Sequence, residues 1–279
     1  MRVCYAADLH GSRTHFTALG ELIARERADA AILGGDLFAD GDEAAPVRSQ
    51  VAHVRDFFLP TIAAWQRQRP GLQVACVNGN HDWSATREEL RAAARAGTLA
   101  LLDLTTPWRC GGQLWLGYHC TPWTPHFVKD FERRDLPDDP LPAEGGLVYD
   151  AAAGQVRPVS GPVHYANYAS MADEMAAAPV LKDGWVFVCH TPPHDTKLDR
   201  LAQVPHPIGS RAVRAFIEQR QPAISLHGHV HESPAVTGAY WQRLGATVSI
   251  NPGQDDHRLA AVVFDLERPA ETIRHTVLG

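Results

Sequence analysis

The sequence predicts an α/β protein in which helices cover β-sheets, and three observations support this fold class. Short apolar runs of about four to eight residues, rich in Val, Ile, Leu and Cys and bounded by Gly and Pro, are typical of buried strands. Amphipathic patterns with helical spacing lie between these runs. From residue 235 on, two consecutive hairpin patterns follow without helices, which predicts antiparallel strands at one edge or in a second sheet.

Five of the apolar runs end abruptly in Asp, Asn or His. They are RVCYAADLHGS with Asp8 and His10, ADAAILGGDLF with Asp36, GLQVACVNGNHDW with Asn80, His81 and Asp82, GWVFVCHTPPH with His190, and PAISLHGHVHES with His227, His229 and His231. Ligands bind at the carboxyl ends of strands in open α/β sheets. These side chains can therefore converge although they span residues 8 to 231.

Four helical patterns connect the strands. Ser12 is expected to cap a helix that buries Phe16, Leu19, Leu22 and Ile23. Residues 47–65 predict a longer helix that is kinked at Pro60. The segment SATREELRAAARAG has a cap, early acidic residues, late arginines and a terminal glycine, and GSRAVRAFIEQRQP offers Ser210 as cap and Pro222 as stop.

Residues 105–180 break this rhythm. The segment WRCGGQLWLGYHC predicts a hairpin that turns at Gly111 and Gly112, VYDAAAGQVRPV predicts a second hairpin, and YANYASMADEMAAAP predicts a short helix. We interpret the chain as a single domain of residues 1–279 with an excursion, or lid, at about 105–180. The excursion overhangs a site, or else it forms a surface or oligomer contact.

Composition limits the partners. The 279 residues are 45% hydrophobic and 21% charged, with a net charge of −6, and 26 basic residues without a basic run face 32 acidic ones. This balance argues against binding of duplex nucleic acid. Without a signal-peptide pattern or an apolar run of roughly 20 residues, we expect a cytoplasmic protein with no membrane partner. The five scattered cysteines, without a C-x-x-C pair, argue against disulfides or a structural zinc site.

The converging residues form a set of metal ligands. Two carboxylates, four imidazoles and one amide oxygen belong to it: Asp8, His10, Asp36, Asn80, His190, His229 and His231. The set is too large for one tetrahedral zinc, and mixed oxygen and nitrogen ligands suit borderline divalent metals. One shared carboxylate would divide it into two sites of four, and two metals about 3.5–4 Å apart can polarise a phosphoryl group and generate a hydroxide.

The order of these motifs resembles a known family. DLH, GGD, GNHD, the lone His190 after VFVC, and GHVH match the five motifs of the calcineurin-like metallophosphoesterases, over the whole chain except residues 105–180. The stretches HTPPHDTKLDR, LHGHVHES and SINPG further resemble the small Icc-related prokaryotic phosphoesterases. The resemblance implies a four-layer α/β/β/α sandwich with two mixed β-sheets flanked by helices.

The resemblance also implies roles for individual residues. Asp8, His10 and His231 would hold the first metal, Asn80, His190 and His229 the second, and Asp36 would bridge both. The metals would be manganese, iron or zinc, divalent or trivalent, and a hydroxide between them would attack phosphorus. His81 would protonate the leaving oxygen, and Asp82 would orient His81.

Several residues remain outside this pattern. The candidates for substrate contact are His227, His194 and His119. A structural role is the alternative for His227, and a solvated polar loop is the alternative for His194. Trp123 or Tyr165 would stack on a base or pack the excursion. No partner pattern accompanies His15, His53, His126, His257 and His275, which are expected to be surface or structural residues.

The resulting function is hydrolysis of a small phosphodiester, such as a nucleotide-like compound, by two metal ions. A phosphomonoesterase or protein phosphatase on the same centre is the first alternative. A non-catalytic metal-binding scaffold is a second, although every motif position holds the expected residue type. A mononuclear hydrolase that uses only the three clustered histidines is a third, and it would tolerate loss of Asp36 or Asn80.

Overall fold

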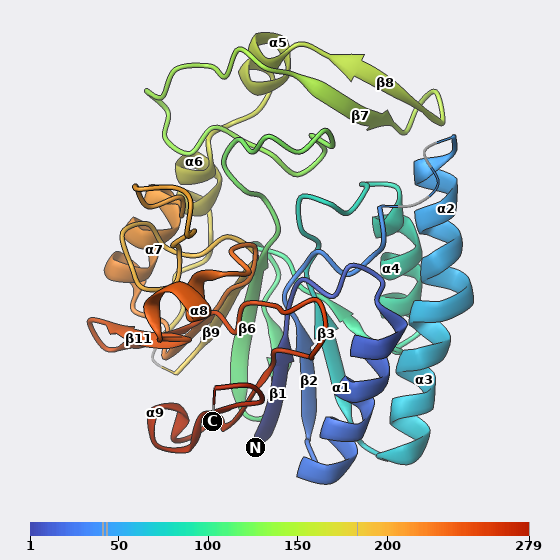
Figure 1. Ribbon diagram of the computed structural model, residues 1–279, viewed down its shortest axis with the longest axis vertical. Helices are drawn as coiled ribbons and strands as arrows, with labels where there is room; N and C mark the ends of the chain where they lie inside the picture. The colour runs from blue at the N-terminus through green and yellow to red at the C-terminus, as the bar shows by residue number, and fades with distance from the viewer. Residues whose placement is uncertain (41, 43, 183, 279) are drawn as a thin grey trace.

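Two six-stranded sheets pack face to face, and helices cover the outer face of each (Figure 1). The structure is a computed structural model that describes residues 1–278 apart from 41, 43 and 183. The first sheet has the order β14 (Arg274–His275), β13 (Val262–Asp265), β1 (Arg2–Ala6), β2 (Ala30–Leu33), β3 (Gln73–Cys76), β4 (Ala100–Leu101). The second has the order β11 (Trp241–Leu244), β12 (Thr247–Ile250), β10 (Ile224–Leu226), β9 (Val186–Cys189), β6 (Gln113–Tyr118), β5 (Trp108–Cys110).

Both sheets are mixed, which confirms the predicted sandwich. Their inner strands run parallel, whereas β13 and β14 in the first sheet and β11 and β5 in the second are antiparallel to their neighbours. The two C-terminal hairpins therefore divide between the sheets. They also contain short helices that the sequence did not predict, α8 (Ser233–Thr237) and α9 (Pro269–Thr272). A proline in the first turn of each favours the helical φ angle.

The remaining helices are α1 (Arg13–Glu26), α2 (Pro46–His53), η1 (Val54–Phe58), α3 (Leu59–Gln68), α4 (Thr86–Arg95), α5 (Gly161–Ala166), α6 (Met171–Ala176) and α7 (Arg211–Arg220). The predicted caps of α1 and α7 are confirmed: Ser12 accepts from the His15 amide at 3.3 Å and Ser210 from the Val213 amide at 3.0 Å. The irregularity near Pro60 is a π-helical turn, η1, between α2 and α3. Proline lacks the N–H that would close the regular ladder there.

The predicted cap of α4 is wrong in one detail. Its N-cap is Ala85, whose side chain accepts no hydrogen bond. Ser84 lies one residue before the cap, and its backbone amide donates to Asp130 Oδ2 at 2.7 Å. The acidic first turn of the helix, with Glu88 and Glu89, agrees with the sequence pattern.

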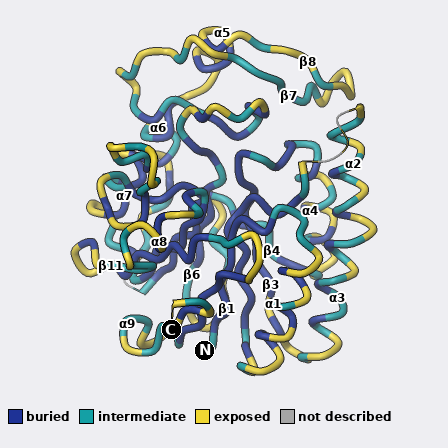
Figure 2. Tube along the Cα trace, in the orientation of Figure 1, coloured by how far each residue is buried: buried dark blue, intermediate teal, exposed yellow. Residues whose placement is uncertain are grey.

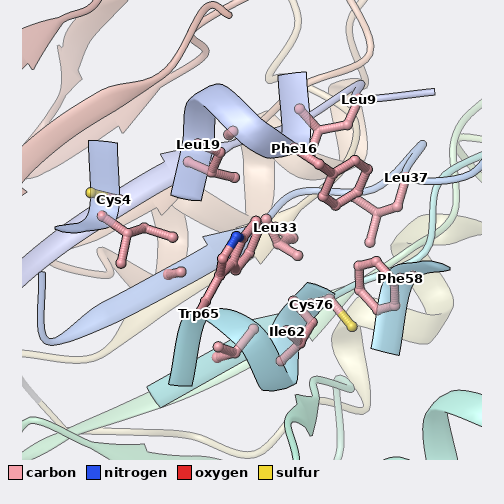
Figure 3. Packing of buried hydrophobic residues seen from close by; sticks show 14 of the residues in the cluster. Cys4, Leu9, Phe16, Leu19, Leu33, Leu37, Phe58, Ile62, Trp65 and Cys76 are labelled. Atoms are coloured by element: carbon pink, nitrogen blue, oxygen red, sulfur yellow. The ribbon is translucent and has the colours of Figure 1, made fainter. Parts of the chain in front are cut away.

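Three hydrophobic clusters hold the layers together, and buried chain fills the centre of Figure 2. The first joins α1, α3 and α4 to the first sheet, and Figure 3 shows Phe16, Phe58 and Trp65 packed over its strands. The second fills the space between the sheets, and the third joins α6 and α7 to the second sheet. On β1, Cys4 faces the helices and Tyr5 faces the opposite sheet, as alternation along a strand requires.

The segment at residues 105–180 begins inside the second sheet. Its first hairpin, β5–β6, turns at Gly111 and Gly112, whose φ angles of +59° and +77° suit glycine. After Tyr118 the chain leaves the sandwich, and the hairpin of β7 (Gly146–Asp150) and β8 (Gln155–Val159) lies with α5 beyond the carboxyl ends of the inner strands (Figure 1). No helix in the described part of the chain is long and apolar enough to cross a membrane.

A buried ion pair fixes the beginning of this excursion. Lys129 and Glu132 have side chains 1% and 0% exposed, with Nζ 3.0 Å from Oε2. Glu132 also accepts hydrogen bonds from the hydroxyls of Thr124 and Tyr165, and Lys129 donates to the carbonyl of Thr124 at 2.7 Å. These bonds tie together three separate parts of the segment.

Removing one charge of this pair should destabilise the protein. Lys129→Met leaves the Glu132 carboxylate buried without its cation, so we expect the free energy of unfolding to fall by about 3 kcal/mol. Urea unfolding measures this, with Lys182→Met, at an exposed lysine, expected to stay within about 0.5 kcal/mol of the parent. If Lys129→Met and Lys182→Met unfold with equal free energies, the Lys129–Glu132 pair does not stabilise the excursion.

Candidate metal centre and active site

The loops that follow five parallel strands meet between the two sheets. In the first sheet, the loop after β1 bonds to the loop after β2: the amide of Asp8 donates to Gly35 O at 2.9 Å, and that of His10 to Asp36 O at 2.9 Å. In the second sheet, Gly228 donates to His190 O at 2.9 Å. The His229 amide joins the two sheets by donating to both carboxylate oxygens of Asp8 at 3.0 Å. Strand direction therefore explains why distant residues converge.

Most of the predicted ligands lie in overlapping groups. Among the described residues, four groups have ligand atoms within 4.8 Å of one another and could hold a metal ion, and three of them contain predicted ligands: Asp8, His10 and His231; His10, Asp36 and His81; and Asp36, His190 and His229. The fourth is Asp40, His81 and His126. Asp36 Oδ2 lies 3.2 Å from His190 Nε2 and 4.0 Å from His10 Nε2. The Asp36 carboxylate thus lies between the groups that the sequence assigned to separate metals.

The chemistry of these atoms fits cations. Nε2 of His10 and Nε2 of His231 lie 3.3 Å apart, a spacing at which two lone pairs repel unless a proton or a metal ion separates them. His190 uses Nδ1 on Gly34 O at 2.8 Å, so Nε2 is directed to the site. His190 Nε2 and Asn80 Oδ1 are two of eleven buried side-chain atoms among the described residues that have no hydrogen-bond partner, and these two lie at the site.

The backbone around these ligands is strained. Asp8, His10, Asp36 and His229 have φ angles of +57°, +42°, +51° and +67°, in the left-handed region that most residues avoid. Such conformations cost roughly 1–3 kcal/mol each and occur most often at functional sites. Gly79 is constrained as well, because a Cβ atom there would collide with the Asp36 carboxylate.

The buried charges shift the pKa values of the site. Burial alone would lower the pKa of His190, but Asp36 and Asp8 outweigh this effect and raise it to about 9. Burial opposes ionisation of Asp36, yet His190 and His81 hold the pKa of its carboxyl well below the ordinary value. Burial and the neighbouring His190 lower the pKa of His229 to about 3. In the protein without metal, the protonated rings of His190 and His81 thus offset the charges of the two carboxylates.

His81 lies beside the ligands and has a carboxylate partner that the sequence did not reveal. Its Nδ1 is 3.0 Å from Asp40 Oδ1, and its amide donates to Asp36 Oδ1 at 2.8 Å. Burial lowers the pKa of His81, but Asp36 and Asp40 outweigh burial and raise it to about 9. The ring is therefore protonated at neutral pH, as a proton donor requires.

Asp82, expected to orient His81, has a different contact. Its carboxylate accepts from the amides of Gly79 at 2.9 Å, Leu37 at 3.1 Å and Phe38 at 3.2 Å. It ties the loop that carries Asp36 to the loop that carries Asn80, and Asp40 takes the contact with the ring.

His126, expected to be a surface or structural residue without a partner pattern, contacts His81. Its ring stacks on that of His81, with 3.6 Å between the ring centroids and 22° between the planes. Its Nδ1 accepts from the Val128 amide at 3.3 Å. Asp40 lies four residues after Asp36, a signal that the sequence offered. His126 carried no comparable signal, because only the fold of the excursion brings it to the site.

A cavity of about 500 Å³ opens over this centre. Residues from five parts of the chain line it: Asp36; Asn80 and His81; Trp123, Thr124, Pro125 and His126; Leu201, Val204, His206 and Ile208; and His229 and His231. Among the described residues, none of those lining it is a lysine or an arginine. The floor carries the candidate ligands and the walls are largely apolar.

The three predicted substrate contacts lie outside this lining. His227 is buried, with Nδ1 2.9 Å from Thr191 O and Nε2 2.9 Å from Ser225 Oγ, which is the structural alternative. His119 accepts from Arg87 at 3.2 Å and packs on Phe131. His194 uses its backbone to bond Ser210 and Arg214. His126 and His206 are the additional histidines at the cavity.

Comparison with known proteins agrees with this fold. The family model described as calcineurin-like phosphoesterase matches residues 1–233. No curated protein sequence matches the chain. Among solved structures, TT1561 of Thermus thermophilus is 16% identical with a TM-score of 0.57, over 100% of this chain and 99% of its own. A dimetal phosphatase from Danio rerio is 12% identical with a TM-score of 0.54, over 94% of this chain and 91% of its own.

The contact between Asp40 and His81 makes a prediction about pH. In metal-free protein, Asp40→Asn removes a negative charge that favours the imidazolium, so the pKa of His81 should fall from about 9 towards its ordinary value. Histidine NMR titration measures the shift, and Asp56→Asn, a change on the distant π-turn, should leave the titration unchanged. An unaltered His81 titration in Asp40→Asn would contradict this pairing.

Proposed function

The chain belongs to the calcineurin-like phosphoesterase family, and we propose that it is a phosphodiesterase that works with two metal ions. Asp8, His10 and His231 would hold one ion, Asn80, His190 and His229 the other, and Asp36 both. The observation that carries the proposal is the position of Asp36 Oδ2 between His190 Nε2 and His10 Nε2. Manganese, iron and zinc all accept such mixed oxygen and nitrogen ligands.

The residues around the ions divide the remaining work. When bound, the ions would supply Lewis-acid activation of the phosphoryl group and of water. His81 holds a proton at the edge of the cavity for the leaving oxygen, and Asp40 positions the ring at 3.0 Å. Asp82 keeps the two ligand loops together through three backbone amides. Trp123 and Leu201 contribute apolar walls that exclude water.

The cavity favours a small phosphodiester over a phosphomonoester or a phosphoprotein. A monoester carries a second negative charge near neutral pH, and beyond the metal ions and His81 no described lysine or arginine in the lining would favour that charge. A diester carries one charge and two organic groups, which suits apolar walls. Because residues 123–126 and 201–208 line the cavity together with the candidate ligands, a small substrate fits better than a protein surface.

Metal stoichiometry tests the two-ion proposal. Protein reconstituted with manganese should carry two ions per chain, and Asp36→Ala should lose most of both, because the shared carboxylate is removed. Elemental analysis after dialysis measures this, with Asp138→Ala, at an exposed aspartate, as the matched control. A fully active Asp36→Ala with one tightly bound ion would end the two-ion proposal and favour a mononuclear hydrolase.

Substrate preference tests the reaction class. Manganese-loaded protein should hydrolyse bis-p-nitrophenyl phosphate with a kcat/KM at least about tenfold above that for p-nitrophenyl phosphate, and a chelator should abolish both activities. The leaving group is p-nitrophenolate in both substrates. The ratio of the two kcat/KM values therefore depends on the charge of the substrate and on its second ester group. Faster monoester cleavage would favour a phosphatase. A fully metallated protein without turnover of either substrate would favour a non-catalytic scaffold.

A further inference from the structure

An exposed tryptophan forms one wall of the cavity. Trp123 is 40% exposed and lines the cavity, so part of its indole is open to a bound molecule. Tyr165, the other aromatic residue considered for stacking, is buried, and its hydroxyl donates to Glu132. Of these two, Trp123 is therefore the one that a bound molecule can reach.

The segment around Trp123 is held in place before any ligand binds. The amide of Thr124 donates to Glu132 Oε2 at 3.2 Å, and its carbonyl accepts from Lys129 Nζ at 2.7 Å. The same Lys129 nitrogen lies 5.9 Å from the Trp123 ring centroid. Since the Lys129–Glu132 pair is buried, these contacts fix the backbone that carries the indole. A wall that is ordered in advance loses little entropy on binding.

The facing wall is apolar and is tied to the metal centre. Leu201, Val204 and Ile208 come from the loop between β9 and α7. The amide of Ala202 donates to Glu232 Oε2 at 3.2 Å, and Glu232 directly follows His231. The loop is thus anchored beside a candidate metal ligand.

We propose that the slot between these walls binds a planar aromatic substituent of the phosphodiester, with Trp123 as its stacking surface. The inference rests on the proposed function, because the phosphate must lie on the floor formed by Asp36, Asn80 and the histidines. A volume of about 500 Å³ is within the range of small-molecule sites and leaves room for one or two rings beside a phosphate.

The charge of the slot selects the chemical class of the substituent. No described residue of the lining is a lysine or arginine, so a second phosphate or a carboxylate would enter without a counter-charge. An aromatic ring needs none, and stacking tolerates different ring types. The class therefore includes nucleobases and simple aryl groups, which share the planar face that Trp123 recognises.

Competitive binding of two diesters whose leaving groups are poorer than p-nitrophenolate, measured over times in which neither is hydrolysed, isolates the ring. Dimethyl phosphate and diphenyl phosphate carry the same charge and differ in their rings, so the ratio of their dissociation constants for manganese-loaded protein measures the slot alone. We expect diphenyl phosphate to bind at least about tenfold more tightly. Trp123→Ala should reduce that ratio by about tenfold, and Trp123→Phe should keep it within about threefold.

Controls separate the slot from its surroundings. Tyr168→Ala, at an exposed aromatic residue of the same excursion outside the cavity lining, should leave the ratio unchanged, and every variant should bind dimethyl phosphate like the parent. Equal affinity of the parent for both diesters would overturn the proposal. So would a Trp123→Ala variant that weakens both diesters equally, because the indole would then support the loop and not the ring.

The design keeps this proposal apart from the proposed function. Calorimetry measures binding without turnover, so a protein that binds the ring but cleaves no diester supports the slot and contradicts the phosphodiesterase proposal. The methyl ester of thymidine 5′-phosphate then identifies the source of the ring. If this ester binds about as tightly as diphenyl phosphate, the slot accepts a nucleobase. If it binds only as weakly as dimethyl phosphate while diphenyl phosphate still binds tightly, the slot accepts a smaller aryl group.

Discussion

Two buried carboxylates at the meeting point of the sheets set the main constraint on this molecule. Asp8 and Asp36 both lie within reach of His190 Nε2, at 3.9 and 3.2 Å, and both side chains are almost completely buried. Burial of two like charges is costly unless cations are close to them. In the metal-free protein the protonated rings of His190 and His81 supply that charge. Bound metal ions would displace the His190 proton, so that metal binding and deprotonation are coupled.

The backbone is shaped to keep the carboxylates there. Left-handed conformations at Asp8 and Asp36 turn the chain sharply after β1 and β2, and the absence of a side chain at Gly79 leaves room for the Asp36 carboxylate. None of these features is stable in isolation. The packed strands beneath them, with Tyr5 and Val188 filling the space between the sheets, hold both sets of loops at a fixed separation. The strain of the site is thus supported by the core.

The sequence predicted the strands, most helix caps and the convergence of the ligands, because each depends on a local pattern and on strand direction. It could not rank the three clustered histidines by local pattern alone: His229 and His231 enter the centre, whereas His227 turns into the core to bond Thr191 and Ser225. Contacts between distant segments were also beyond it. The stacking of His126 on His81 depends on where the excursion folds back, and no periodicity encodes that.

The candidate metal ligands and the cavity walls come from structurally different parts of the chain. The residues that would carry out the chemistry are therefore separate from those that would select the substrate. The ligands follow central strands, whose positions are fixed by two sheets, so changes there would alter the chemistry itself. The walls come from loops, which tolerate change more readily. The Lys129–Glu132 pair is informative here, because an apolar pair of similar volume would often be as stable or more so. The charged pair adds directional hydrogen bonds that an apolar pair lacks. Glu132 accepts from Thr124 and Tyr165, and Lys129 donates to the Thr124 carbonyl, so one arrangement of the segment is preferred. That directionality sets the position of Trp123 over the floor, and a shape-selective wall requires such a fixed position.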